Sequence, residues 1–128
     1  MVFDTDIIIW VQRGDARAAR LIERAETRAI STQSYLELLQ CASNKKQLKL
    51  TRDFLRASRI AVFPLTENIG HRASIYIEQY GLSHGLRAGD AIIAATTVEN
   101  AETLSSSNAK HYRMLPDLDF KEFKPSVS

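Results

Sequence analysis

The chain has 128 residues, with 17 Lys and Arg against 15 Asp and Glu, so its formal net charge is only +2. Hydrophobic residues make up 45% and charged residues 25%, a composition that excludes a disordered chain. Cys41 is the only cysteine, which excludes an internal disulfide and a cysteine-based zinc site. No apolar run approaches the roughly 20 residues needed to span a bilayer. We therefore expect a single domain, residues 1–128, in the reducing cytoplasm.

The first part of the chain predicts a strand and two helices. Residues 1–4 have the apolar pattern of a short buried strand. Thr5 is placed to cap the helix that follows, and Gly14 ends this helix. Residues 16–26 repeat apolar side chains at helical spacing and predict a second helix.

The middle of the chain predicts two strands that enclose two more helices. Residues 28–31 are too short for a helix and suit a strand, and residues 60–63 predict the next strand, which Pro64 stops. Between them, residues 31–42 and 44–58 have helical periodicity.

The last third continues the alternation of helix and strand. We predict a helix over 66–80 ended by Gly81, a loop over 82–87, a helix over 88–100, a strand over 102–105, a helical turn over 108–113 and an edge strand over 120–123. Helices separate the strands regularly, which indicates an α/β fold with a central, mainly parallel sheet of about five strands.

Acidic and amide side chains follow two of the predicted strands. Asp4 closes the first strand, Asp6 enters the next helix, and Asn108 lies just beyond the fourth strand. Asp90 opens the helix that leads into that strand. Ligands of open parallel sheets bind beyond the carboxyl ends of the strands, so these groups converge if the first and fourth strands are neighbours. Alternatively, Asp6 and Asp90 only complement helix dipoles, worth about 0.3–1 kcal/mol each.

Glu37 has two interpretations. At about 100° per residue it lies opposite the apolar stripe of its helix, which contains Tyr35, Leu38, Leu39 and Ala42. That position predicts a solvated side chain. The alternative is that Glu37 overlooks the cleft from the helix side that is not packed, which periodicity cannot show.

A cluster of carboxylates has an electrostatic consequence. Two carboxylates about 4 Å apart repel by roughly 4 kcal/mol at an effective dielectric constant near 20. Several together raise one another's pKa values unless a cation binds. Oxygen ligands of this kind suit Mg²⁺ or Mn²⁺. Such a metal site points to phosphodiester hydrolysis, in which the ion lowers the pKa of a water and stabilises the leaving oxygen.

Four motifs follow one another along nearly the whole chain: FDTDIIIW, STQSYLELLQ, GDAIIAAT and LSSSNAKHY. In this order and spacing they resemble a PIN-domain ribonuclease of the VapC type, the toxin of a bacterial toxin–antitoxin pair. The resemblance implies a three-layer α/β/α fold with strand order 3-2-1-4-5 and Mg²⁺-dependent cleavage of RNA that leaves a 5′-phosphate. It also implies a homodimer and a cognate antitoxin, which often inserts an arginine among the acids.

The resemblance assigns roles to individual residues. The metal-binding acids of the family match Asp4, Glu37 and Asp90, which reverses the solvated interpretation of Glu37. Asp6 matches a supporting position, Ser106 matches a hydroxyl residue, and Asn108 matches a polar residue that holds a metal-bound water. The catalytic set that the resemblance implies is Asp4, Glu37, Asp90 and Asn108.

One segment departs from the family pattern. After the Asn, family members often carry a further acid, where this chain has Lys110 and His111. The departure removes one anionic ligand, and it leaves open whether one or two metal ions bind. His111 is then either a contact for the scissile phosphate or an exposed surface histidine.

Basic residues suggest how RNA is held. Arg87, Lys110 and Arg113 flank the predicted cleft and are the candidate phosphate contacts. Two longer basic sets at helical spacing, Arg13, Arg17, Arg20 and Arg24, and Lys45, Lys46, Lys49 and Arg52, are better explained as solvated helix faces. The alternative to a nuclease is a PIN-like module that binds RNA or protein without cleaving it.

Overall fold

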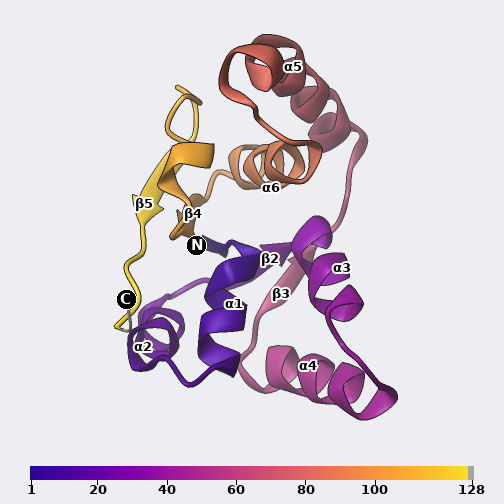
Figure 1. The fold of residues 1–128 in the computed structure, drawn as a ribbon, viewed down its shortest axis with the longest axis vertical. Coiled ribbons are helices and arrows are strands. Elements are labelled where there is room, and N and C mark those ends of the chain that lie inside the picture. Colours follow the sequence, from indigo (N-terminus) through magenta and orange to yellow (C-terminus); the bar gives the residue numbers. More distant parts are fainter. Residues whose placement is uncertain (127–128) are drawn as a thin grey trace.

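The computed structural model describes residues 1–126 as a sheet of five strands covered by helices (Figure 1). The strands are β1 (Val2–Phe3), β2 (Ala29–Ser31), β3 (Ala61–Phe63), β4 (Thr103–Ser106) and β5 (Asp119–Glu122). Every pairing is parallel and the order is β3-β2-β1-β4-β5. The predicted α/β class and strand order are thus confirmed. Because β1 pairs with both β2 and β4, its carboxyl end lies at the centre of the sheet edge.

The helices form the two outer layers. They are α1 (Thr5–Gln12), α2 (Ala16–Arg24), α3 (Thr32–Gln40), α4 (Lys45–Ala57), α5 (Glu67–His84) and α6 (Ala88–Glu99), with a single 3₁₀ turn, η1 (Ala109–His111). Helices α5 and α6 lie on one side of the sheet, and the first four helices lie on the other (Figure 1). Across residues 1–126, none of the helices has the length and apolar character that a membrane crossing requires.

Strand alternation divides the core in two. Val2 and Leu104 pair in register and face the α5–α6 side, where both are fully buried. Phe3 follows Val2 in the chain, and Ile30 follows Ala29, the partner of Val2 in β2; both point to the opposite face and pack with α1 and α2. Each fully buried side chain of this size stabilises the fold by about 1.5–3 kcal/mol. The central strands β1, β2 and β4 are therefore buried, which leaves their carboxyl ends as the place for polar groups.

The cap of α1 differs from the prediction. Asp4 occupies the N-cap position, and its carboxylate accepts a hydrogen bond from the N–H of Thr5 at 2.8 Å. Thr5 is instead the first helical residue. The hydroxyl of Thr5 is consequently free to make the contacts described below.

The end of α5 also differs. The helix continues through Gly81 to His84, so the predicted loop over 82–87 is wrong in its first three residues. Gly85 ends the helix with a left-handed backbone, at φ 68°. Glycine is favoured at a left-handed residue because it has no Cβ, whereas a glycine inside a helix is only tolerated.

Candidate active site at the carboxyl edge of the sheet

Asp4 is the buried centre of this edge. Its Oδ2 accepts hydrogen bonds from the hydroxyls of Ser106, at 2.6 Å, and Tyr112, at 3.1 Å, while its Oδ1 caps α1. Burial, and then the charge of Asp6, raises the pKa of Asp4 from 3.8 to about 7, although the hydrogen bonds oppose the rise. Asp4 therefore exchanges its proton near neutral pH.

Asp6 lies in the first turn of α1, beside the segment that follows β4. Its Oδ2 accepts hydrogen bonds from the N–H of Ser107, at 2.9 Å, and from the Ser107 hydroxyl. Its Oδ1 is buried and has no hydrogen-bond partner within residues 1–126. An unsatisfied buried carboxylate oxygen is unfavourable. This oxygen is thus a candidate contact for a water or a cation.

Asp90 lies in the first turn of α6, and a single hydroxyl connects it to Asp4. The Tyr112 hydroxyl is 3.5 Å from Asp90 Oδ1, and His111 Nδ1 is 3.5 Å from Oδ2. Burial raises the pKa of Asp90, against the opposing effects of His111, Tyr112 and Arg87. His111 therefore lies beside a carboxylate of the cluster, unlike a surface histidine without contacts.

Tyr112 is the site residue that the sequence did not reveal. It is 1% exposed and stacks on Phe120, with ring centroids 5.7 Å apart. Burial and the neighbouring carboxylates of Asp4 and Asp90 raise the pKa of the Tyr112 phenol, so it remains a hydrogen-bond donor. Its aromatic neighbours fix the position of that donor between the two acids.

Glu37 reaches the same edge through Thr5. The Thr5 hydroxyl donates to Glu37 Oε1 at 2.7 Å and lies 2.9 Å from the Ser34 hydroxyl. Glu37 is half-buried, so the solvated position that periodicity favoured is wrong. Within residues 1–126, no direct hydrogen bond joins Glu37 to Asp4, Asp6 or Asp90. Glu37 is therefore connected to the cluster through Thr5, whose N–H donates to Asp4.

Ser106 and Asn108 organise the end of β4. The Ser106 hydroxyl donates to Asp4 and accepts a hydrogen bond from the N–H of Asn108 at 3.0 Å. Asn108 itself is exposed, and its side chain makes no capping bond to η1. Ser106 thus positions a carboxylate, while the Asn108 amide faces solvent beside it.

The three predicted phosphate-binding cations differ in their surroundings. Arg87 is the exposed N-cap residue of α6, three residues before Asp90. Lys110 is exposed in η1. Arg113 pairs with Glu122 of β5 at 2.7 Å, so its charge is partly compensated. Arg87 and Lys110 are accordingly the stronger candidates.

The donor set can be tested against a divalent cation. Within residues 1–126, no three His, Cys, Asp or Glu side chains are placed closely enough together to hold a metal ion. Two observations nevertheless fit a divalent cation at this site. Asp4 and Asp90 both lie near the Tyr112 hydroxyl, and burial raises the pKa of both carboxyls. The unsatisfied Oδ1 of Asp6 is a third. These hard oxygen donors fit Mg²⁺ or Mn²⁺.

Acids gathered at the carboxyl edge of a parallel sheet define an α/β protein with its candidate ligand site at that edge. The model of the PIN domain family matches residues 1–114, and the chain belongs to this family. The resemblance noted from the four sequence motifs is thus confirmed. No curated protein matches the chain.

Solved structures with the same fold come from toxin–antitoxin complexes. A chain of a toxin–antitoxin complex from Klebsiella pneumoniae is 26% identical, with a TM-score of 0.77, over 91% of this chain and 93% of that one. VapBC2 from Rickettsia felis, bound to a DNA fragment from its promoter, gives 22% identity and a TM-score of 0.77, over 97% and 100%. VapBC-1 from nontypeable Haemophilus influenzae gives 19% identity and a TM-score of 0.79, over 95% of this chain and 98% of that one.

Proposed function

We propose that this chain is the toxin of a toxin–antitoxin pair and that it hydrolyses RNA phosphodiester bonds with a divalent metal ion. The observation that carries the proposal is the meeting of Asp4 and Asp90 at the Tyr112 hydroxyl, at the carboxyl edge of a PIN-domain sheet. The likeness to chains of toxin–antitoxin complexes supports the biological context.

The proposed metal ligands are Asp4, Asp90 and Glu37, and the ion is Mg²⁺ or Mn²⁺. When bound, such an ion lowers the pKa of a water and stabilises the leaving oxygen of the phosphodiester. Glu37 would approach through the hydroxyl of Thr5, which it already contacts. In this proposal a water lies between Glu37 and the ion, because Mg²⁺ commonly keeps part of its hydration shell.

The remaining site residues have positioning roles in this proposal. Ser106 holds the Asp4 carboxylate, and Asp6 holds the Ser107 backbone that shapes the end of β4. Asn108 would orient a water at the ion. The exposed Arg87, which acts on the charge of Asp90, and the exposed Lys110 of η1 would contact RNA phosphates, with Arg113 in a weaker role because of its pairing.

A non-cleaving PIN-like module is the second candidate. One observation favours it: the acids of the described chain do not form a group of three, and Tyr112 already donates to Asp4. Such a protein would bind RNA or a partner protein at the same edge without chemistry. The two candidates differ in one measurable property, which is metal-dependent cleavage.

RNA cleavage with and without a chelator separates these candidates. We expect the wild type to cut RNA in Mg²⁺ or Mn²⁺ and to be inactive in EDTA, and Asp4→Asn to be inactive in both. Asp53→Asn is the matched control, because Asp53 lies on α4 in an exposed ion pair with Lys49. RNA that survives equally with and without EDTA would exclude the nuclease. Full activity in Asp4→Asn would remove Asp4 from the site.

The proposed partners are a cognate antitoxin and a second copy of the chain. An antitoxin arginine placed among Asp4, Asp6 and Asp90 would form charge-assisted hydrogen bonds with carboxylates that otherwise repel. A short reading frame beside the gene, with a DNA-binding N-terminal part, would supply this antitoxin. Its product should co-purify with the chain and suppress cleavage, and light scattering on the purified chain should give the mass of a dimer.

A further inference from the structure

A groove of about 430 Å³ lies between α2 and the segment that continues from β5, away from the acid cluster. Its walls carry five cationic side chains: Arg17, Arg20, Arg24, Lys121 and Lys124. All five are exposed, and within residues 1–126 none of them takes part in an ion pair. The single acid of the lining, Glu122, is paired with Arg113. The groove is therefore strongly positive on a protein whose net charge is only +2.

Helix and strand geometry place these cations opposite one another. Arg17, Arg20 and Arg24 share one face of α2, because they are three and seven residues apart, while Ala18 and Ile22 of the same helix are buried. At about 1.5 Å of rise per residue, the three arginines cover roughly 10 Å of helix. They form a row of charge along one wall.

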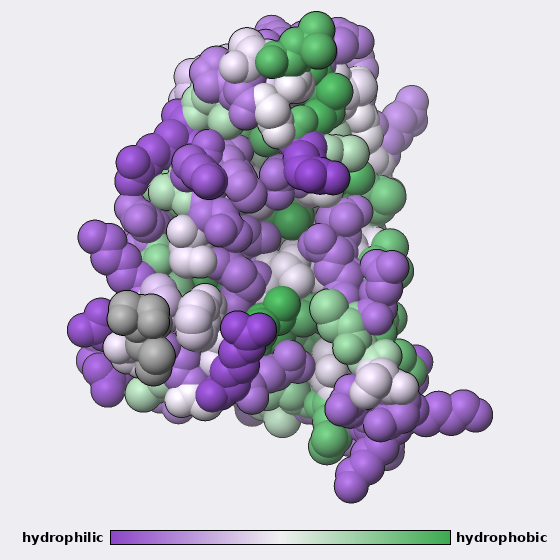
Figure 2. Space-filling view, in the orientation of Figure 1, coloured by the Kyte–Doolittle hydropathy of each residue, from purple (hydrophilic) through white to green (hydrophobic). Residues whose placement is uncertain are grey.

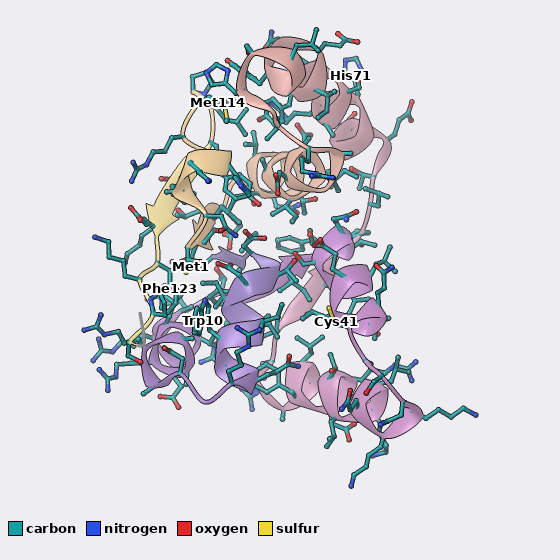
Figure 3. The ribbon with its side chains drawn as sticks, in the orientation of Figure 1. Met1, Trp10, Cys41, His71, Met114 and Phe123 are labelled. Carbon is teal, nitrogen blue, oxygen red and sulfur yellow. The ribbon has the colours of Figure 1, made fainter. Side chains whose placement is uncertain are left out.

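The second wall comes from the sheet. Lys121 pairs in register with Ser105, and Ser105 with Phe3, so these side chains point to the α2 side. Met1 and Phe123, both of which line the groove, lie close together in Figure 3. In Figure 2, hydrophilic residues gather along the left side of the drawn face, the side on which Figure 1 places α2 and β5.

An unsatisfied hydroxyl lies at the bottom of the groove. Ser105 is 1% exposed, it belongs to the lining, and its Oγ has no hydrogen-bond partner within residues 1–126. Buried hydroxyls normally have a partner. A phosphate oxygen or a bridging water in the groove would supply one.

Strand β4 connects the groove to the candidate active site. Ser105 lines the groove, and the next residue, Ser106, holds the Asp4 carboxylate. At the strand end, the N–H of Phe123 donates to the carbonyl of Ser106 at 2.8 Å, and Lys124 follows directly. The groove and the acid cluster are therefore built on consecutive residues of the same strand.

We propose that this groove binds the phosphodiester backbone of single-stranded RNA and leads it to the carboxyl edge of the sheet. The inference rests on the proposed function for the identity of the polyanion. Unpaired arginines and lysines in a row suit phosphates, whereas base stacking requires exposed aromatic rings. The one aromatic side chain of the lining, Phe123, is buried. Binding here is consequently indifferent to base sequence, and sequence preference resides elsewhere.

The test measures the salt dependence of RNA binding in EDTA, where cleavage does not interfere. The probe is a short fluorescein-labelled oligouridine, followed by anisotropy. The triple variant Arg17→Gln, Arg20→Gln, Arg24→Gln removes three contacts, which should reduce the slope of log K against log salt by about 2, at roughly 0.7 per phosphate. Between about 50 and 200 mM salt, the wild type should then lose about twentyfold more affinity than the variant.

A matched control removes the same charge elsewhere. The triple variant Lys45→Gln, Lys46→Gln, Arg52→Gln on α4 also loses three exposed cations, but none of them lines the groove. Its slope should stay close to that of the wild type. Equal slopes in the wild type and the α2 variant would overturn the proposal, as would equal losses in both variants. Circular dichroism melting of both variants verifies that they fold.

Two further outcomes separate this inference from the proposed function. If the wild type never cuts RNA but the slope of log K against log salt falls in the α2 variant, RNA binding in the groove is supported and the nuclease activity is excluded. If the wild type cuts RNA and this slope is unchanged in the α2 variant, the nuclease activity is supported and RNA binding in the groove is excluded. An oligoglutamate peptide that binds the groove more tightly than oligouridine would assign the surface to an acidic protein segment and overturn the RNA assignment.

Discussion

Replacing Asp4 with Asn should stabilise the metal-free protein above neutral pH and have little effect near pH 4. The pKa of Asp4 rises from 3.8 to about 7 on folding, mainly because the carboxyl is buried. Below pH 3.8 the carboxyl is protonated in both states and costs nothing. Between 3.8 and about 7 only the unfolded chain ionises, so folding loses stability as the pH rises, and above 7 the loss is complete.

The size of this loss follows from the shift. A rise from 3.8 to about 7, at about 1.4 kcal/mol per pKa unit, corresponds to about 4 kcal/mol. Asn imitates the neutral acid but replaces one acceptor oxygen with an NH₂ donor, which faces the Ser106 and Tyr112 hydroxyls. Part of the gain is lost in this way, and we expect Asp4→Asn to be about 2–4 kcal/mol more stable than the wild type at pH 8.

Urea unfolding in EDTA, followed by circular dichroism from pH 4 to pH 8, measures this difference. The m-value should be the same for both proteins, so that the midpoints report stability directly. The stability difference should grow across the range and level off above pH 7. A difference that stays constant with pH would refute the reasoning, because it would show that Asp4 has the same pKa in the folded and unfolded chain.

Three other variants probe the neighbours of Asp4. Mg²⁺ should raise the melting temperature of the wild type more than that of Asp90→Asn, and equal shifts would remove Asp90 from the ligand set. Tyr112→Phe keeps the ring stack but deletes the shared donor, so it should cost about 1–3 kcal/mol in EDTA by urea unfolding; no loss would show that the two carboxylates do not depend on this hydroxyl. Thr5→Val should reduce cleavage at a nearly unchanged melting temperature, because it deletes the hydroxyl that holds Glu37; unchanged cleavage would place Glu37 outside the site.

The position of the acids was predictable because strand order decides which chain ends meet. Asp4 and Asn108 each follow a predicted strand, and parallel strands bring such ends to one edge. The one unknown was whether the first and fourth strands are neighbours, and β1 does pair with β4. The convergence therefore rests on a single topological fact, which the four family motifs supplied and the residue pattern alone did not.

Periodicity misplaced Glu37 because it assumes one buried face for each helix. Helix α3 contacts α1, α4 and α6, so several of its sides are covered by protein. A residue opposite the apolar stripe is then solvated only if no other element packs there. Glu37 meets Thr5 of α1 on that side. Hydrophobic patterning identifies the first packing partner of a helix, and polar contacts with the others leave no periodic signal.

Tyr112 left no such signal either. It follows η1 in a segment without regular secondary structure, where neither a period of 3.6 nor a period of 2 marks the inward residues. The predicted end of the helix at Gly81 is likewise wrong, because the left-handed backbone that ends α5 is at Gly85. Both features depend on the backbone path, which local sequence does not specify.

The acid cluster can be neutralised in three ways, and they exclude one another. A proton occupies Asp4 below its pKa of about 7, a divalent ion would replace that proton, and an antitoxin arginine would replace the ion. Metal affinity should therefore rise with pH through neutrality, as the proton on Asp4 is lost. Binding of the proposed antitoxin should follow the same curve, because its arginine needs the same ionised carboxylate. Inhibition by such a partner would thus be competition for charge at one buried group, and it would need no change in the fold.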